Sequence, residues 1–554
     1  MEKKIKVTYR GFETLEFDEG VTFKEISEKF KHNYNYDILV AKVDNDIVDL
    51  SETLKKKCSI DFYDRSSSTG NEVYSKSAIF ILLLAAKNVL GEDIDILVDH
   101  SMDNGVYCKV TGVSLTKSLL QDVYDEMMQI VRDDYIYTKI SVSRIDAIKY
   151  FKKLNKLDKV NVLKYISNTY INLYRINDMY DYFHGKLAYS TSQINDFKLT
   201  LVNKNGFVLS VPDILNPECT LDYVFHEKVF NKFEEYGEWA KILGLENASD
   251  LNQAVSHAKV CELVNLAEAY YDSQLAKIAD EIYNSNRKIK LVLIAGPSSS
   301  GKTTTSKKLD IYLRSKGFAT HPIALDNYFT DISKRPLDEN GNPDFESIRA
   351  IDVELFNKNL SDLLDGKKVN LPTFNFVLGK REYKGNSLQL GEKDIIIVEG
   401  LHALNDELTM SINKSQKYKI YISPLTQMNI DTHNYIHTSD VRKLRRIIRD
   451  SKTRGHGAKE TLEMWPAIKN GERENIFKFQ DSVDTVINSS LIYEIGVLKT
   501  YVEPLLFNVS EEDPEYPEAL RLINFLRNFL PIPSDDIPSN SVLREFIGGS
   551  CFKD

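Results

Sequence analysis

The chain has 554 residues, of which 42% are hydrophobic and 27% are charged, and it carries a net charge of −10 at pH 7. This composition is typical of folded globular proteins. The acidic balance argues against a protein that coats nucleic acid in general, though not against a local basic groove. The N-terminus lacks the apolar stretch of a signal peptide, and the longest apolar run (residues 78–86) is too short to span a bilayer. The five cysteines form no CxxC pair. We therefore expect a cytoplasmic protein with free thiols and no membrane contact.

Residues 1–63 predict a small β-grasp module. Ile5, Val7 and Tyr9 alternate with polar residues as in a strand, and GFETLEF predicts a second strand. VTFKEISEKF has helical spacing, ILVAKVDNDIVDL predicts a hairpin that turns at Asp44–Asp46, and SIDFYD closes the unit. The order β-β-α-β-β-β is typical of a ubiquitin-like fold.

Residues 64–286 form the second part of the chain, after the polar boundary DRSSSTGNE. Within residues 64–225 we expect a buried helix at 77–89, paired strands at 95–99 and 106–110, and an amphipathic helix at 115–133. Residues 226–286 are almost purely helical in pattern and predict a helical connector.

Residues 287–500 predict an α/β domain. The short apolar runs KLVLIA, HPIAL, KDIIIVEG and YKIYIS are separated by helical stretches. This alternation is typical of a parallel sheet that is covered on both faces. Residues 501–554 predict a C-terminal helical tail, with one amphipathic helix in PEALRLINFLRNFL.

A phosphate-binding pattern opens the predicted α/β domain. GPSSSGKTT fits GxxxxGK[ST] in full and lies between a predicted strand and a predicted helix. Backbone N–H groups of such a loop close around phosphate oxygens, Lys302 would reach the β- and γ-phosphates, and Thr303 would offer its hydroxyl to Mg²⁺. The candidate residues for binding ATP and Mg²⁺ are Gly296, Pro297, Ser298, Ser299, Ser300, Gly301, Lys302, Thr303 and Thr304.

The same loop can serve a kinase, an ATPase or a GTPase. Asn155-Lys-Leu-Asp158 has the NKxD form of a guanine-reading motif, but it precedes the loop, whereas in translational GTPases it follows the loop. We therefore interpret it as the solvated face of an amphipathic helix.

Two carboxylates end predicted strands in this domain. Asp326 ends HPIALD and Glu399 ends DIIIVE, so both are expected at the carboxyl edge of the sheet, near the phosphates. There Asp326 could accept the proton of an attacking hydroxyl, and Glu399 could hold Mg²⁺ through water.

A basic helix follows in DVRKLRRIIRDSKTRGHG. Its arginines, Arg442, Arg445, Arg446 and Arg449, with Arg454 beyond them, fit either a solvated face or a lid that closes over the transferring phosphoryl group.

In their order and spacing, GPSSSGKTT, LDNYF, DFESIRAID, LPTFNF, VEGLHAL and RRIIRDSKTRG resemble the uridine kinase family, within the phosphoribulokinase/uridine kinase group of P-loop kinases. The resemblance implies that Asp326 is the base for the ribose 5′-hydroxyl. It also implies that Arg446, Arg449 and Arg454 are lid arginines. The sugar and base positions that it implies are Phe345, Glu346, Phe374 and Phe376.

The chain departs from the uridine kinase pattern where that pattern reads the base. Phe374 stands in place of a tyrosine and Gly379 in place of a histidine, so the preferred base is open. Asn375, Lys380 and Arg381 are the nearby candidates for polar contacts with the substrate, and we include Arg381 among the substrate-binding residues.

The first 225 residues resemble the N-terminal half of threonyl-tRNA synthetase, with a TGS domain and an editing-type second domain. The resemblance rests on VAKVDNDIVDLSETLKKKCSIDFYD, YSKSAIFILLLAA and VDHSMDNGVYCKV. Since the helix YSKSAIFILLLAA lacks the histidines of the editing site, we expect neither zinc binding nor deacylation of mischarged tRNA.

His433 and His437 form an HxxxH pair that could lie on one helix face, but no third ligand is evident, and we expect a structural role.

These residues predict an ATP- and Mg²⁺-dependent nucleoside kinase, with a small-molecule nucleoside as substrate and a homo-oligomeric state. One alternative is a kinase of the same group that acts on a sugar phosphate or pantothenate. Another is an RNA- or ribosome-associated regulatory ATPase, because RNA contact through the N-terminal domains stays open.

Overall fold

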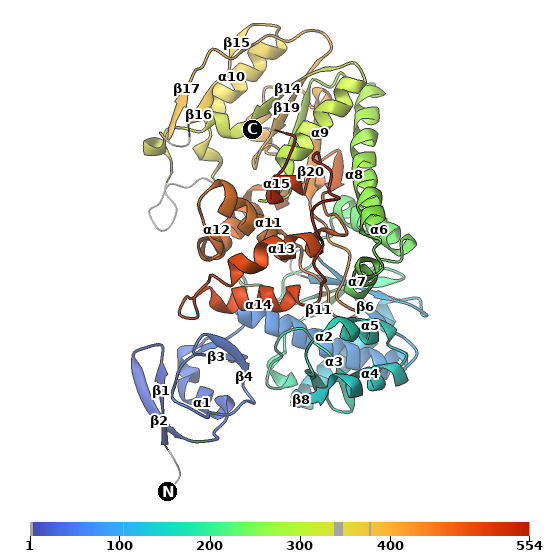
Figure 1. Cartoon of the computed structure of the whole chain (residues 1–554), viewed down its shortest axis with the longest axis vertical. Coiled ribbons are helices and arrows are strands. Elements are labelled where there is room, and N and C mark those ends of the chain that lie inside the picture. The colour runs from blue at the N-terminus through green and yellow to red at the C-terminus, as the bar shows by residue number, and fades with distance from the viewer. Residues whose placement is uncertain (1–3, 103–104, 337–346, 376–377, 553–554) are drawn as a thin grey trace.

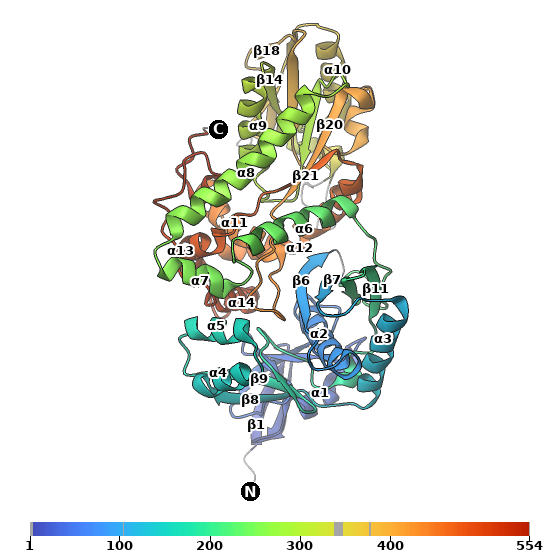
Figure 2. The ribbon, with the colours of Figure 1, turned by 90° about the vertical axis from the view of Figure 1, so that its right-hand side faces the viewer.

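Residues 4–102, 105–336, 347–375 and 378–552 are described in the computed structural model. In Figure 1 the chain starts in a small sheet module at one end of the long axis and reaches a larger, sheet-containing part at the other end. Helices α11–α14 lie between the two ends, and the C-terminus lies near the larger sheet. Figure 2 shows the same order of parts from the side.

The N-terminal module has the predicted β-β-α-β-β-β order. Its elements are β1 (Lys4–Tyr9), β2 (Glu13–Asp18), α1 (Phe23–Phe30), β3 (Val40–Val43), β4 (Asp46–Asp49) and β5 (Cys58–Tyr63). The sheet order is β2-β1-β5-β3-β4, with β1 parallel to β5. Asp44 and Asn45 have φ values of 48° and 66°, so the β3–β4 hairpin turns where the sequence predicted it, in the left-handed conformation that Asp and Asn tolerate.

Two antiparallel sheets and four helices follow. The helices are α2 (Ser68–Leu90), α3 (Lys117–Arg132), α4 (Arg144–Lys153) and α5 (Leu157–Tyr165). The strands are β6 (Ile96–Met102), β7 (Gly105–Val110), β8 (Thr138–Ser143), β9 (Tyr170–Ile176), β10 (Met179–Asp181), β11 (Lys198–Asn203) and β12 (Gly206–Ser210). The sheets have the orders β11-β12-β7-β6 and β10-β9-β8. Helix α2 is long and apolar enough to cross a membrane, but its most apolar stretch is 67% buried, which identifies it as the core helix of this region.

The segment predicted as a connector is helical. It consists of α6 (Glu227–Ile242), α7 (Ala248–Ser256) and α8 (Val260–Tyr283). Helix α8 packs against the helix that follows the phosphate loop, where the Tyr271 and Thr305 hydroxyls are 2.5 Å apart. The connector therefore supports the site-bearing domain directly.

A five-stranded parallel sheet forms the centre of the larger part, in the order β14-β19-β13-β20-β21. Its strands are β13 (Leu291–Ala295), β14 (Ala319–Ala324), β19 (Asp394–Glu399), β20 (Lys417–Ser423) and β21 (Thr485–Asn488). Successive residues of β13 enter different cores, with Val292 and Ile294 on one face and Leu291 and Leu293 on the other. This burial on both faces explains why the strands are continuous apolar runs, and it confirms the predicted α/β fold.

The remaining elements surround this sheet or lie beside it. They are α9 (Lys302–Ser315), α10 (Val353–Leu364), β15 (Val369–Asn370), β16 (Thr373–Asn375), β17 (Lys380–Glu382), β18 (Ser387–Leu388), α11 (Thr438–Thr453), α12 (Ala458–Asn475), α13 (Glu494–Leu506), α14 (Tyr516–Leu526) and α15 (Arg544–Ile547). Buried residues of α13, α14 and α15 share one core with α8, α9 and α11. The C-terminal segment is thus part of the packed interior.

Asp158 contradicts the interpretation of the NKxD stretch as a solvated helix face. Asn155 has φ 56° in the turn before α5, and Asp158 accepts hydrogen bonds from the Thr432 N–H (2.9 Å) and hydroxyl (2.6 Å). Next to it, Lys159 is buried and pairs with Asp181 and Asp431, at 2.8 and 3.0 Å. Helix α5 therefore docks on the loop that precedes α11, a contact with no local signal in the sequence.

The HxxxH pair does not lie on one helix face. His433 is in the loop before α11, where it is hydrogen-bonded to Asp181, and His437 is the N-cap of α11. His433 thus has the structural role that we expected.

Two histidines at the junction of α2, α11 and α14 predict a pH effect on stability. Burial, reinforced by Lys76 and Arg521, lowers the pKa of His184 to about 3, and burial lowers the pKa of His437 to about 4 against the opposing charge of Asp440. Both values are below the ordinary 6.5, so unfolding takes up protons between about pH 4 and 6.5. Stability should therefore fall as the pH falls through this window.

We expect the urea midpoint to drop between pH 7 and pH 5, and to drop less in the double variant His184→Asn/His437→Asn. The exposed His257→Asn is the control and should keep the full drop. An equal drop in the double variant and in the unmodified protein would show that these histidines do not carry the effect.

Candidate active site

The phosphate loop has the backbone that its sequence requires. Gly301 has φ 85°, and a Cβ atom at Gly296 would lie 2.0 Å from the Ile422 carbonyl oxygen, so neither position accommodates a side chain without rearrangement. Ser299 has φ 60°, a strained value for a non-glycine residue. The loop joins β13 to α9, so the amides in the first turn of α9 face the loop.

The loop lysine and threonine lie beside the loop carbonyls and Glu399. The Lys302 ammonium group donates to the carbonyl oxygens of Gly296 (2.9 Å) and Pro297 (3.2 Å). The Thr303 hydroxyl donates to Glu399 Oε1 at 3.4 Å. Thr303 and Glu399, the two predicted metal ligands, therefore lie side by side, although they come from α9 and β19.

Glu399 is the last residue of β19, as the sequence predicted, whereas Asp326 does not end a strand: β14 stops at Ala324, and Asp326 lies in the 3₁₀ turn Leu325–Tyr328 that follows it. Because β14 pairs with β19, both carboxylates still lie at the same edge of the sheet. Asp326 is accessible to solvent, yet the surrounding protein removes enough water to raise the pKa of its carboxyl group, with Lys302 and Arg454 opposing. Burial raises the pKa of Glu399 to about 7, with Lys302 opposing and Asp326 contributing to the increase. Two neighbouring carboxyl groups with raised pKa values are typical of a functional site.

The arginines that we predicted to form a lid are gathered by one buried carboxylate that sequence reasoning missed. Asp450 is fully buried and lies 3.0 Å from Arg446, 2.9 Å from Arg449 and 3.6 Å from Arg454. Arg446 also donates to the Ser298 hydroxyl at 2.5 Å. Asp450 therefore holds the three arginines as a group next to the phosphate loop.

Two other arginines of α11 donate hydrogen bonds to backbone carbonyls of the phosphate loop. Arg445 is fully buried, pairs with Glu494 at 2.7 Å, and donates to the Ser299 carbonyl at 3.3 Å. Arg442 donates to the Ser298 carbonyl at 3.0 Å and pairs with Glu472. The alternative of a solvated basic face does not fit these two residues.

On the substrate side, Arg381 pairs with Asp352 at 2.9 Å. Phe374 is 5% exposed, contacts Phe329, and lies under the Arg335 guanidinium at 5.0 Å. Arg335, which sequence analysis did not single out, thus covers an aromatic position of the predicted base site. Phe345, Glu346 and Phe376 lie outside the described residues.

A third missed residue comes from the C-terminal segment. Glu545 Oε2 accepts hydrogen bonds from the Thr304 backbone N–H (3.1 Å) and the Thr304 hydroxyl (2.8 Å). The two residues are 241 positions apart, so no local pattern could have linked them.

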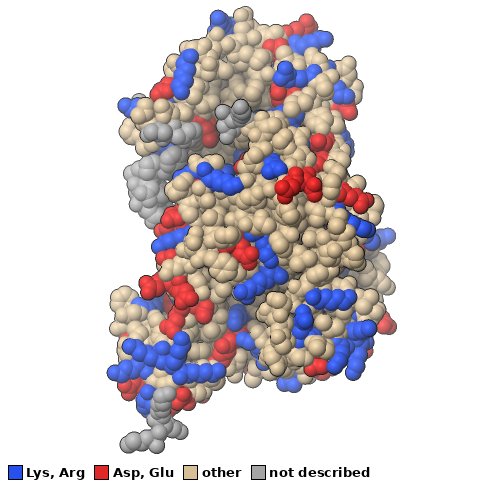
Figure 3. Space-filling model, in the orientation of Figure 1, with Lys and Arg blue, Asp and Glu red and all other residues tan. Residues whose placement is uncertain are grey.

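The loop residues fit a bound nucleotide and a divalent cation. Among the residues that the structure describes, the buried Ser299 and Ser300 hydroxyls have no hydrogen-bond partner. These donors, together with Lys302, suit phosphate oxygens, and Thr303 and Glu399 offer the oxygen ligands that Mg²⁺ prefers. On the face shown in Figure 3, the surface is hollowed between the part with the central sheet and the part with α11 and α12.

Comparisons with known proteins divide the chain into two regions. A model of the phosphoribulokinase/uridine kinase family matches residues 291–491. The chain is similar to a uridine kinase of Halobacterium salinarum, at 30% identity over 173 residues, which cover 31% of this chain and 67% of that protein. It is also similar to a uridine kinase of Staphylococcus aureus, at 30% identity over 178 residues, 32% of this chain and 76% of that protein.

The N-terminal region is similar to part of a threonine–tRNA ligase of Acetivibrio thermocellus. The identity is 26% over 200 residues, which cover 36% of this chain and 31% of the ligase. The chain therefore matches less than a third of that enzyme. The two predicted resemblances, to a uridine kinase and to part of a threonyl-tRNA synthetase, are confirmed.

Proposed function

Because this chain belongs to the phosphoribulokinase/uridine kinase family, we propose that it transfers the γ-phosphoryl group of ATP to the 5′-hydroxyl of a ribonucleoside. The observation that carries the proposal is the arrangement at the carboxyl edge of the sheet. Glu399 ends β19, Asp326 lies in the turn just past the end of the neighbouring strand β14, and the charge of Lys302 acts on both carboxyl groups. These three residues support the proposal because they are suited to act as a base, a metal ligand and a phosphate-binding cation at one edge of the sheet.

Each residue has a role that follows from its position. When bound, Mg²⁺-ATP supplies the phosphoryl group and a cation that offsets its charge. Lys302 exchanges its loop carbonyls for phosphate oxygens, and Asp326 orients the attacking hydroxyl and accepts its proton. Arg446 and Arg449, held by Asp450, neutralise the charge that spreads over the transferring group. Most of the catalysis is then positioning and electrostatics.

The proposal is tested by ADP release in the presence of ribonucleosides, sugar phosphates, pantothenate or tRNA. We expect release to depend on a ribonucleoside and to yield a nucleoside monophosphate. Release that depends on a sugar phosphate or pantothenate would instead assign the chain to another kinase of the same group. Stimulation by tRNA without a phosphorylated product would assign it to the RNA-associated ATPases.

We predict that selection between uridine and other ribonucleosides is weak, or that the preferred base is not uracil. Phe374 offers no hydroxyl, and Gly379 has φ 63° with the Ile332 side chain 2.4 Å from where a Cβ atom would lie, so an imidazole does not fit there without rearrangement. An apolar slot discriminates by only ~10–200-fold, whereas hydrogen bonds to the base edge give ~10⁴–10⁵. Uridine should therefore not be preferred over every other ribonucleoside by more than ~10³.

The measurement is kcat/KM for uridine, cytidine, adenosine, guanosine and inosine under one condition. A uridine preference above ~10³ over all the others would contradict the prediction. It would mean that polar groups such as Asn375, Lys380 or Arg381 read the base.

A further inference from the structure

The last helix of the chain places a carboxylate on the phosphate loop. Glu545, in α15, accepts from both the Thr304 backbone N–H and the Thr304 hydroxyl, at 3.1 and 2.8 Å. Thr304 lies in the first turn of α9, where backbone N–H groups have no partner within the helix. A carboxylate therefore satisfies a donor of the anion-binding end of this helix.

The same donors serve the phosphates of a nucleotide. In a P-loop the backbone N–H groups of the loop and of the helix that follows cradle the phosphates. The Glu545 carboxylate and a nucleotide phosphate therefore need the same amide, and both are negatively charged. Glu545 also contributes to the electrostatics of the crevice, because its charge adds to burial in raising the pKa of Glu399 and opposes the burial that lowers the pKa of Lys302.

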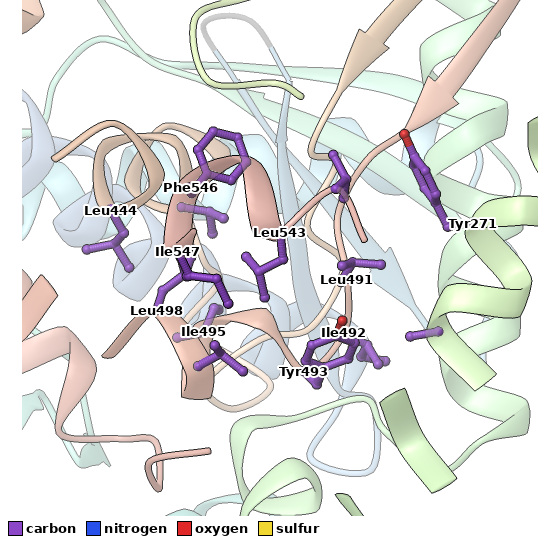
Figure 4. Packing of buried hydrophobic residues seen from close by; sticks show 14 of the residues in the cluster. Tyr271, Leu444, Leu491, Ile492, Tyr493, Ile495, Leu498, Leu543, Phe546 and Ile547 are labelled. Atoms are coloured by element: carbon purple, nitrogen blue, oxygen red, sulfur yellow. The ribbon is translucent and has the colours of Figure 1, made fainter. Parts of the chain in front are cut away.

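The backbone that carries Glu545 is anchored. Leu543, Phe546 and Ile547 are 0%, 1% and 4% exposed, and Figure 4 shows them packed among Leu444 of α11 and Leu498 of α13. Val542 lies against the phosphate loop, with its Cγ2 atom 2.4 Å from where a Cβ atom of Gly301 would be. The Lys452 ammonium group at the end of α11 donates to the Ile547 carbonyl. Glu545 is not among the buried core residues of α15, so its side chain can leave the loop without unpacking the core.

We propose that Glu545 sets the nucleotide affinity of this protein, because its carboxylate occupies the Thr304 amide until a nucleotide displaces it. The inference rests on the proposed function only in taking the phosphate loop as the nucleotide site. In the nucleotide-free protein the Glu545 carboxylate holds the loop in shape. A nucleotide must displace its hydrogen bond to the Thr304 amide and overcome the repulsion of its negative charge. The C-terminal segment is thereby a working part of the nucleotide site.

The test is the Kd of Mg²⁺-ATP and Mg²⁺-ADP for the full chain, measured by calorimetry without a nucleoside. Glu545→Gln keeps the size of the side chain but replaces a charged acceptor with a neutral one. Since hydrogen bonds to charged groups are worth more than neutral ones by a margin that corresponds to ~10-fold in Kd, both nucleotides should bind about tenfold more tightly. Asp536→Asn, an exposed carboxylate of the same segment, is the matched control and should bind like the unmodified protein.

Glu545→Asp is a second variant, which keeps the negative charge but shortens the side chain by one methylene group. It should also bind nucleotides more tightly, by less than Glu545→Gln. Unchanged or weaker binding in both variants, with unaltered thermal unfolding, would overturn the inference, and so would the absence of nucleotide binding in every protein tested. Tighter binding in Glu545→Gln together with no phosphorylation of any nucleoside would contradict only the proposed function.

Discussion

Lys302→Ala should reduce phosphoryl transfer by at least ~10²–10³, to a level that is hard to detect, while the protein stays folded. The Lys302 ammonium group is the cation of the phosphate loop, and it acts on both Asp326 and Glu399. Without it, Arg446 and Arg449 are the remaining side chains that offset the charge on the transferring group. Lys302 is itself partly exposed, so water can reach the carbonyls of Gly296 and Pro297 once the side chain is removed.

The measurement is the rate of ADP formation with a saturating nucleoside, together with thermal unfolding. Arg314→Ala, at the other end of α9, removes a cation that is exposed and pairs with Asp310 at 3.7 Å, and it should leave the rate unchanged. A Lys302→Ala protein with more than a tenth of the normal rate would show that the loop lysine is not required.

Asp326→Asn should lower kcat by ~10²–10⁴, the usual contribution of a positioned general base. The variant keeps the shape of the side chain but cannot accept the hydroxyl proton. Because the pKa of Asp326 is raised, the normal rate should rise with pH through that pKa, and this rise should be missing in the variant.

Nucleotide binding separates this effect from a structural one. Asp326→Asn should bind Mg²⁺-ATP at least as well as the unmodified protein, because it removes a negative charge near the phosphates. Asp365→Asn, an exposed carboxylate at the end of α10, is the control and should keep the normal rate. Near-normal turnover in Asp326→Asn would remove Asp326 from the mechanism.

Local patterns predicted most of the fold. The order of the N-terminal module and the turn at Asp44–Asn45 follow from short-range periodicity and turn chemistry, and the phosphate loop is a contiguous motif. Four strands of the central sheet were evident as apolar runs bounded by helical stretches. The fifth, β21, has four residues in a polar context and was not predicted.

Contacts between distant segments were not predictable. Asp158 belongs to a helix that looks solvated in the sequence, but it bonds to Thr432, 274 positions away. Asp450 is a different case, because it is four residues from Arg446 and Arg454 and next to Arg449, so helical spacing could have indicated this pairing. The bond between Glu545 and Thr304 depends on how the C-terminal segment folds over the kinase core.

The central claim is that this crevice phosphorylates the 5′-hydroxyl of a ribonucleoside, and identification of the product tests it most directly. The full chain is incubated with Mg²⁺-ATP and a mixture of ribonucleosides, and the phosphorylated products are identified by mass and by phosphorus NMR. The account predicts a nucleoside 5′-monophosphate formed in step with ADP by the unmodified protein and not by Lys302→Ala. ADP formed with inorganic phosphate alone, or phosphate attached to another position or to another class of acceptor, would contradict it.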